Sequence, residues 1–290
     1  MKALILILLI VVVFGSGAYW THRLYLRPQQ ALKEEKALPP EPPPPDSSLP
    51  EFESCMALVK GGKVLEAREA LAEFIEHNPQ STKLAEAKAQ LGAINVDLFL
   101  STKPAPDKEV YTVKSGDVLN RVATRMKSTP ELIARANKLQ ANAKENIILR
   151  IGQQLTVPTA EFSLIIRKTA KTVTLLNRGK FFKEYSIRSV PASAAAPKKS
   201  SGAPPKLSGK VNDKIAWAPS GTRVIFTEKE HAEASHWIVV SVGGHTLYAE
   251  PDPGSDRKVT KPPTGLGLAP EDVEELAVLL RKGDPVTVEP

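Results

Sequence analysis

The sequence predicts a multidomain α+β protein: an N-terminal membrane helix, a short helical repeat, a β-α-α-β module and a mainly β domain with one C-terminal helix. Three observations lead to this class. An uncharged apolar run opens the chain, and the 25 prolines are bunched, which marks boundaries between domains. The spacing of apolar residues changes from helical to alternating after Phe162. We therefore expect several small domains on linkers.

Residues 1–20 predict an export signal that remains as a single-pass membrane anchor. From Ala3 to Trp20, 18 residues pass without a charge, which is about the length of a membrane-spanning helix. Tyr19 and Trp20 are typical of the aromatic belt at a membrane interface. Cleavage after Gly17 is the alternative. Because the later domains would then lie outside the cytoplasm, nucleic acid is excluded as a partner despite the net charge of +7.

Residues 21–50 predict an extended linker, since proline dominates the stretch from Pro39 to Pro50. Such a stretch cannot bury a core and favours polyproline II at ~3.1 Å per residue, a reach of up to about 90 Å. The linker predicts folded parts held away from the membrane.

Residues 51–101 predict three helices, because their apolar residues recur at helical spacing with breaks at Gly61–Gly62 and Asn78–Pro79. Cys55 is the only cysteine and falls on the apolar face of the first helix, so we expect a buried structural residue. The stretch G-K-V-L-E-A-R-E-A-L-A-E-F-I-E-H-N-P resembles a tetratricopeptide repeat but covers only one and a half repeats. A groove for a partner protein and a plain helical spacer or dimer contact both remain open.

Residues 109–158 predict a compact β-α-α-β unit. A strand at Val110–Val113 is followed by Gly116, which permits a turn, and by Asp117, which we expect to cap the first helix. A second helix begins at Pro130, and a strand at Gln154–Val157 closes the unit.

This unit, with E-V-Y-T-V-K-S-G-D-V-L at its start and I-G-Q-Q-L-T-V-P at its end, resembles the LysM family. The resemblance implies binding of the N-acetylglucosamine-containing backbone of peptidoglycan or chitin. The family's sugar groove lies between the loop after the first strand and the loop before the last. The resemblance implies that this groove falls in the segments 115–119, 137–139 and 147–151 of this sequence. Its residues would be Ser115, Gly116, Asp117, Val118, Leu119, Asn137, Leu139, Ile147 and Ile148.

Two departures from the LysM pattern concern this groove. Val118 stands where the family usually has threonine, which removes one hydroxyl. The segment from Asn137 to Gly152 is a few residues longer than usual.

Residues 161–290 predict a mainly β domain. Asn177–Gly179 is typical of a tight hairpin turn, the stretch 191–209 is rich in Ala, Pro and Ser and predicts a flexible interruption, and a helix is expected at 270–282. The strands are expected at 164–166, 172–176, 181–187, 223–226, 237–242, 246–250 and 285–288.

The stretches T-V-T-L-L-N-R-G-K-F-F-K-E-Y-S-I and T-G-L-G-L-A-P-E-D-V-E-E-L resemble the L,D-transpeptidase (YkuD-like) catalytic domain. That family crosslinks peptidoglycan stem peptides through a cysteine thiolate with histidine as the base. Aligned through the C-terminal helix, Gly265 takes the position of the cysteine, Pro263 and Tyr248 those of the histidines, and Gly267 that of the arginine. Without a thiol no acyl-enzyme forms, so we expect a domain without transpeptidase activity.

The remaining candidates for chemistry are three histidines and two aspartates: His231, His236, His245, Asp252 and Asp256. The spacing of the histidines fits neither one helix face nor a zinc motif. We expect ordinary surface or turn histidines, with no metal site and no cofactor.

The resulting hypothesis is a peptidoglycan-binding protein of the bacterial cell envelope, anchored in the inner membrane with its domains on the periplasmic side and with an inactive transpeptidase-like domain. One alternative is an active L,D-transpeptidase or another cell-wall enzyme that uses other residues. A second is an envelope adaptor that binds a protein partner through residues 51–101.

Cell fractionation is expected to recover the full-length protein in the membrane fraction, with its domains open to protease added from outside, because the run Ala3 to Trp20 carries no charge. Recovery in the soluble cytoplasmic fraction would contradict the anchor.

Overall fold

The computed structural model describes residues 16–17, 19–26, 46–191, 206–242, 245–252, 254 and 265–289. The chain divides into two compact units, Met1–Asp46 and Ser47–Pro290. In the first unit the described residues 16–17 and 19–26 are helical, with a π-helical turn η1 at His22–Leu26 inside the predicted linker. Among the described residues no helix is long and apolar enough to span a membrane. The apolar run Ala3–Phe14 and the linker residues 27–45 lie outside them.

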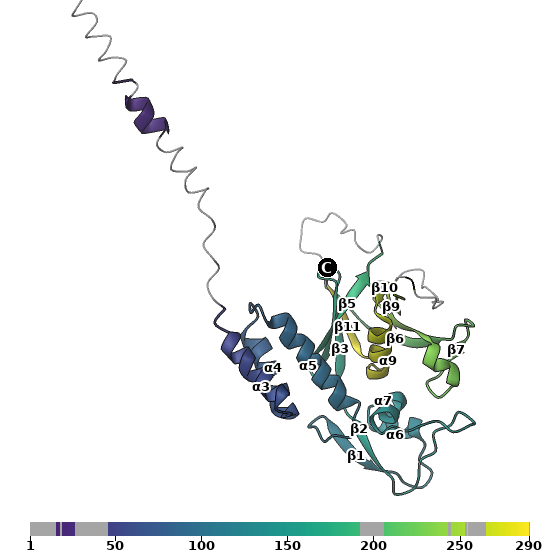
Figure 1. Ribbon diagram of the computed structural model, residues 1–290. Coiled ribbons are helices and arrows are strands. Elements are labelled where there is room, and N and C mark those ends of the chain that lie inside the picture. Colours follow the sequence, from purple (N-terminus) through teal and green to yellow (C-terminus); the bar gives the residue numbers. More distant parts are fainter. Residues whose placement is uncertain are drawn as a thin grey trace, which may run out of the picture. The chain divides into compact units, whose positions relative to one another are not determined.

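The predicted helical segment forms three helices, α3 (Leu49–Lys60), α4 (Val64–His77) and α5 (Leu84–Phe99), shown in Figure 1. The breaks fall at the predicted Gly61–Gly62 and Asn78–Pro79. Cys55 is buried in their shared core, as predicted.

Helix α5 packs against the long strand β5 (Lys180–Ser189) of the C-terminal domain. The Asn95 side chain donates a hydrogen bond to the Phe182 carbonyl at 2.8 Å, and the Phe99 ring meets the Phe182 ring edge-on at 5.0 Å. Lys88 and Glu184 form an ion pair at 3.2 Å. Contacts such as these join the helices to the β domain, and residues 47–290 form one compact unit.

The β-α-α-β unit is formed as predicted, from β1 (Lys108–Thr112), α6 (Leu119–Arg125), α7 (Pro130–Ala136) and β2 (Gln154–Pro158). The two strands are antiparallel, with Val110 opposite Thr156. We refer to this unit as the β-α-α-β module.

The C-terminal domain begins with a meander of β3 (Phe162–Arg167), β4 (Thr172–Asn177) and β5. Arg178 and Gly179 join β4 to β5 with φ angles of 51° and 77°. Two consecutive positive φ values are typical of the type I′ turn that suits a twisted hairpin, so the predicted hairpin is confirmed.

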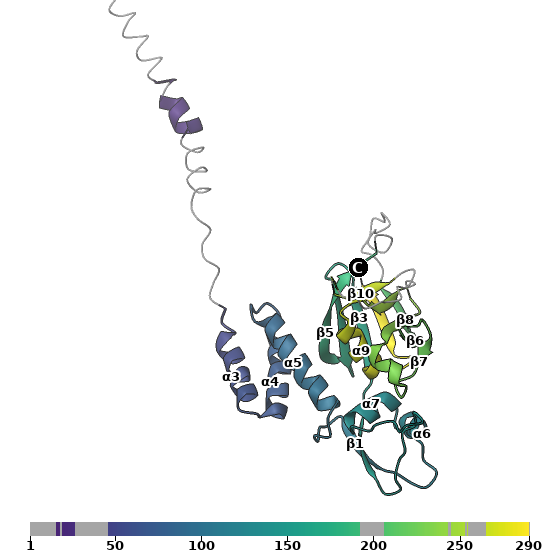
Figure 2. The same cartoon turned by 45° about the vertical axis from the view of Figure 1, so that its right-hand side comes forward.

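The sheet of this domain closes on itself. Its strand order is β11-β3-β4-β5-β10-β9-β8-β6-β7, and β11 also pairs with β6, which gives a barrel-like form (Figure 2). The remaining strands are β6 (Leu207–Trp217), β7 (Arg223–Val224), β8 (Ser235–Val240), β9 (Thr246–Ala249), β10 (Leu266–Leu268) and β11 (Pro285–Glu289).

Two strands were not predicted, and one lies partly in the expected flexible interruption. Residues Leu207–Gly209 belong to β6, whose sequence L-S-G-K-V-N-D-K-I-A-W has little intrinsic strand character. Its extended form is imposed by pairing with β8 on one side and β11 on the other. Strand β10 has only three residues and was too short to recognise.

Helix α9 (Pro270–Leu279) packs against β8 and β9 and ends before the predicted Lys282. Leu280 is already extended, with ψ at 151°. The ammonium of Lys214, on β6, donates hydrogen bonds to the carbonyls of Ala277 and Leu280 at 2.5 and 2.6 Å. A buried cation therefore satisfies the carbonyls that the end of the helix leaves free.

Helix α7 of the β-α-α-β module also lies against α9. The Thr129 hydroxyl donates to the Val278 carbonyl at 3.1 Å, and Arg135 pairs with Glu274 at 2.6 Å. Leu132 joins the core of the β domain, whereas its neighbour Ile133 joins the core of the module. Helix α7 is thus shared by two hydrophobic cores.

Replacing Lys214 by methionine should destabilise the protein by about 1–3 kcal/mol, because buried carbonyls lose their donor. Thermal or urea unfolding measures this, and Lys210→Met, an exposed lysine of the same strand, should change little. Burial lowers the pKa of Lys214 to about 8. The unfolded chain therefore holds this proton more tightly, and the advantage of the wild type over Lys214→Met should grow as pH rises from about 8 towards 10.4.

Candidate functional site

The loop after β1 is held by a cluster of polar side chains around Asp117. The Asp117 carboxylate accepts hydrogen bonds from the Tyr111 hydroxyl at 2.6 Å and from the Lys114 amide at 2.8 Å. Arg125 donates to the Tyr111 hydroxyl and lies 3.5 Å from the carboxylate. The prediction that Asp117 caps α6 is wrong, because its carboxylate faces back to β1 and the cap position is occupied by Val118, which makes no side-chain cap.

These hydrogen bonds keep the Asp117 carboxylate charged. The Tyr111 hydroxyl, the Lys114 amide and the Arg125 charge lower its pKa below the ordinary value. In turn, the hydrogen bond to Asp117 raises the pKa of Tyr111. A charged acceptor with several donors is a strong local constraint, so the loop 114–118 is held in one conformation.

The loop before β2 is tied to the same place. Gly152, with φ at 81°, donates its amide to the Val113 carbonyl, and the Val113 amide donates to the Gln153 carbonyl, both at 2.9 Å. Val113 directly precedes the loop 114–118. The two loops that the sequence analysis assigned to a groove therefore lie side by side.

Three large apolar side chains are exposed on these two loops. Val118 is 53% exposed, Ile148 69% and Ile151 74%. Exposed apolar side chains beside a rigid loop favour contact with a ligand that has apolar faces, because such contact removes them from water. Val118 and Ile148 were predicted for the site, and Ile151 ends the predicted segment.

Two predicted site residues have structural roles instead. Leu119 is buried in the core of the module. The Asn137 amide donates to the Thr156 carbonyl at 2.7 Å and its oxygen accepts from the Thr156 amide at 2.8 Å, which fixes the end of α7 to β2.

Of the other residues predicted for the glycan groove, two lie on the surface and two are partly buried. Ser115 and Gly116 are exposed, and Gly116 has a φ of 78° that favours glycine. Leu139 and Ile147 are partly buried against the module core.

Two of the four positions that the sequence analysis aligned with catalytic residues, Tyr248 and Gly267, lie in one row of the sheet. Tyr248 on β9 is the register partner of Gly267 on β10, which in turn pairs with Ser189 on β5. The hydroxyls of Tyr248 and Ser189 are 3.2 Å apart. Gly265 is buried directly before β10, and Pro263 lies outside the described residues.

Gly267 is crowded by two side chains that the sequence analysis missed. A Cβ atom at this position would lie 2.2 Å from a carboxylate oxygen of Glu250 and 2.4 Å from the hydroxyl of Ser189. That Glu250 oxygen is buried, and within the described part of the chain it has no hydrogen-bond partner. Strand alternation places Glu250 on the same face as Tyr248, which was the available indication.

The histidines do not lie as expected. His236 and His245 are buried rather than surface residues, and the ring nitrogens of His231 and His236 approach to 3.2 Å. Asp252 pairs with Arg188 at 2.6 Å, and Asp256 lies outside the described residues. No group of three or more potential metal ligands occurs in the part of the chain that the structure describes.

Comparison with known families matches residues 111–158 to the LysM domain. This stretch runs from Tyr111 of β1 to Pro158 at the end of β2 and contains both loops of the candidate groove.

Among solved structures, the chain is similar to L,D-transpeptidases. That of Mycobacterium smegmatis is 15% identical over 49% of this chain and 65% of its own, with a TM-score of 0.30. One from Stackebrandtia nassauensis is 15% identical over 60% of this chain and 68% of its own, with a TM-score of 0.30. A variant from Enterococcus faecium is 18% identical over 49% of this chain and 55% of its own, with a TM-score of 0.28. The match thus spans less than two thirds of the Mycobacterium smegmatis and Enterococcus faecium chains.

Replacing Asp117 by asparagine should loosen the loop 114–118, because a neutral amide accepts less strongly and no longer attracts Arg125. The Lys114 amide should exchange with deuterium on the order of tenfold faster, while Glu109→Gln, an exposed residue of β1, should leave it unchanged. Since the folded pKa of Asp117 is lowered, its contribution is complete above about pH 3.9 and is lost as pH falls through the folded value. An unchanged exchange rate would contradict the role of Asp117.

Proposed function

We propose that the protein binds the glycan backbone of peptidoglycan in the bacterial cell envelope, through the β-α-α-β module. The observation that carries the proposal is the LysM match at residues 111–158 together with the two adjoining loops that expose Val118, Ile148 and Ile151. Sugar rings present apolar C–H faces between their hydroxyls. The apolar side chains would contact those faces, while the loop amides and Ser115 would meet the polar groups.

The rigidity of the loops supports this assignment. Asp117 fixes the first loop, and Val113 fixes the second loop beside it. A surface that is already ordered loses less conformational entropy when a ligand binds. A small groove of this kind would still give modest affinity for a single sugar chain.

We also propose that the N-terminal run anchors the protein in the inner membrane, with the other domains in the periplasm. The support is the charge-free stretch from Ala3 to Trp20 and the proline-rich stretch that follows it. This placement would bring the module to the cell wall.

The C-terminal domain, in this proposal, carries out no transpeptidation. The chain has one cysteine, Cys55, which is buried between α3 and its neighbouring helices, and burial raises the pKa of its thiol. A buried thiol of raised pKa is a poor nucleophile. Gly265 and Gly267 provide no reactive group, and Glu250 and Ser189 fill the space beside Gly267.

An adaptor role of residues 51–101 finds less support. The face of α5 that would have been available to a partner packs against β5 of the same chain. The helical segment therefore suits a structural role beside the β domain.

Replacing Ile148 by aspartate in the full-length protein should weaken retention on purified sacculi roughly 5- to 30-fold, because an exposed apolar contact is replaced by a charge. Leu65→Asp is the matched control, since Leu65 is an exposed apolar residue of α4 outside the module. Co-sedimentation at several protein concentrations measures both. Equal retention of the two variants would argue against the groove.

The purified protein, incubated with muropeptides that carry tetrapeptide stems, should form neither 3-3 crosslinks nor an acyl-enzyme, because no activated thiol is present. Gly265→Cys should also remain inactive, since a thiol of pKa ~8.5 is only a few per cent thiolate at neutral pH and would still lack a base. Mass spectrometry detects both products, with an active L,D-transpeptidase as the positive control. Either product from the unmodified protein would instead favour the alternative of an active enzyme.

A further inference from the structure

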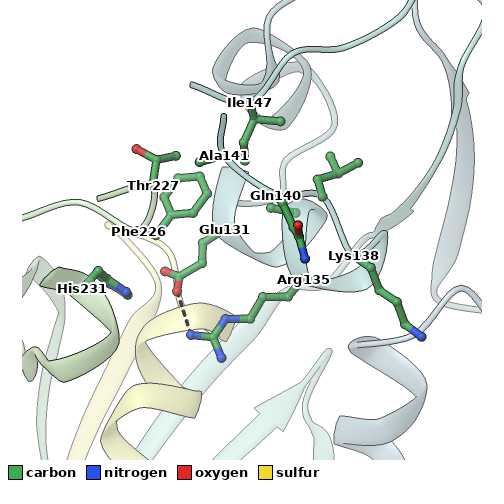
Figure 3. Close-up of a pocket in the computed structure, with 11 residues that line it drawn as sticks. Glu131, Arg135, Lys138, Gln140, Ala141, Ile147, Phe226, Thr227 and His231 are labelled. Carbon is green, nitrogen blue, oxygen red and sulfur yellow. Dashed lines mark hydrogen bonds and ion pairs between the residues drawn. The ribbon is translucent and has the colours of Figure 1, made fainter. Parts of the chain in front are cut away.

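A cavity of about 440 Å³ lies between the β-α-α-β module and the C-terminal domain (Figure 3). Helix α7 and the segment after it form one wall, and residues next to the short 3-10 helix η2 (Lys229–Glu233) form the other. The volume lies within the range of ligand sites, which often occur between domains. The lining residues are Glu131, Ala134, Arg135, Lys138, Leu139, Gln140, Ala141, Ile147, Phe226, Thr227 and His231.

Two of the three charged residues that line this cavity, Glu131 and Arg135, are paired with each other. Arg135 lies between Glu131 at 3.1 Å and Glu274 at 2.6 Å, so its charge is compensated on two sides. Figure 3 shows the Lys138 side chain directed away from Phe226 and His231. The cavity therefore offers no strong net charge, which disfavours an ionic ligand and suits a neutral one.

The apolar part of the cavity is formed by both domains. Phe226 of the C-terminal domain is only partly buried and packs against the module core, as do Leu139 and Ile147. Ala134 completes this surface from α7. An aromatic ring and small apolar side chains suit the apolar face of a sugar and the methyl group of an acetamide.

Polar groups that can bind a neutral ligand lie beside this apolar surface. The Gln140 amide, on the segment after α7, and the Thr227 hydroxyl form no side-chain hydrogen bonds within the described residues. Burial lowers the pKa of His231, so its imidazole is neutral near pH 7. Its Nε2 lies 3.2 Å from Nε2 of His236, which leaves Nδ1 as the ring nitrogen for a ligand. Amide, hydroxyl and imidazole groups together match the hydroxyl and acetamide groups of an N-acetylated sugar.

We propose that this cavity is a second saccharide subsite, which binds a neutral N-acetylated sugar of the same glycan chain that occupies the groove of the module. The inference rests on the proposed glycan binding and extends it to the C-terminal domain. Ile147 lines the cavity, while Ile148, the next residue, is exposed in the candidate groove. A longer glycan can thus pass from the groove into the cavity.

The lengthened segment between Asn137 and Gly152 gives the cavity part of its wall. Gln140 and Ala141 belong to this segment and line the cavity. The contacts of Arg135 with Glu274 and of Thr129 with Val278 hold α7, which forms one wall, against α9 of the C-terminal domain. The extra residues of this module are therefore explained by a subsite that requires the second domain.

The test compares binding of a trimer and a hexamer of N-acetylglucosamine to the full-length protein by calorimetry. Ala141→Trp should fill the cavity, since Ala141 is exposed and lines it. Ala143→Trp is the matched control, because Ala143 is exposed on the same segment and does not line the cavity. The double variant Gln140→Ala, Thr227→Val removes polar groups without adding bulk.

The expected result is that the wild type and Ala143→Trp bind the hexamer on the order of tenfold more tightly than the trimer, about 1.4 kcal/mol. Ala141→Trp and the double variant should bind the hexamer no more tightly than the trimer. Their affinity for the trimer should equal that of the wild type. Ile148→Asp should weaken the binding of both oligomers.

Three results would overturn the inference, and they are distinguishable. In one outcome the wild type binds both oligomers while the cavity variants still bind the hexamer more tightly than the trimer. In that case the cavity is not a subsite, and glycan binding by the module stands. If the wild type binds neither oligomer, the proposed function itself fails. If the wild type binds the hexamer no more tightly than the trimer, there is no second subsite, although glycan binding by the module stands.

Discussion

The packing of α9 on two sides is the constraint on which the arrangement of residues 47–290 depends. One side of this helix contacts β8 and β9 of the barrel-like sheet, and the other meets α7 of the β-α-α-β module. Leu132 of α7 enters the barrel core, and Arg135 is clamped between Glu131 and Glu274. Because α7 also contributes Ile133 to the module core, neither domain can rotate without exposing apolar surface that is now buried.

This constraint gives the candidate sites their form. Asp117 and Val113 hold the two groove loops of the module in place through contacts within the module itself. The second domain is not needed to order these loops. The cavity does need one, since Phe226, Thr227 and His231 come from the C-terminal domain. In the proposed function, the C-terminal domain supplies a fixed wall against which the β-α-α-β module would bind a longer ligand.

The row formed by Tyr248, Gly267 and Ser189 shows how a sheet accommodates a glycine between larger side chains. Pairing between β9, β10 and β5 depends on backbone hydrogen bonds and on the buried neighbours Leu266 and Leu268, which do not require a cysteine or histidine. The space that a side chain would need at Gly267 is taken by Glu250 and Ser189. Packing of the surrounding side chains has adapted to the small residue.

By itself the sequence determined the elements whose causes are local. Helical spacing and breaks at Gly61–Gly62 and Asn78–Pro79 predicted α3 to α5. The turn residues Asn177–Gly179 predicted the hairpin, and the strand-turn-helix pattern around Gly116 predicted the module. Only the tertiary structure decided what depends on distant partners. Strand β6 is extended because β8 and β11 pair with it, α9 ends early where Lys214 reaches its carbonyls, and Asp117 turns to Tyr111 rather than to the helix. The cavity follows the same rule, because its walls, residues 131–147 and 226–231, are far apart in the sequence and meet only through packing. Spacing along the chain does not reveal such a meeting.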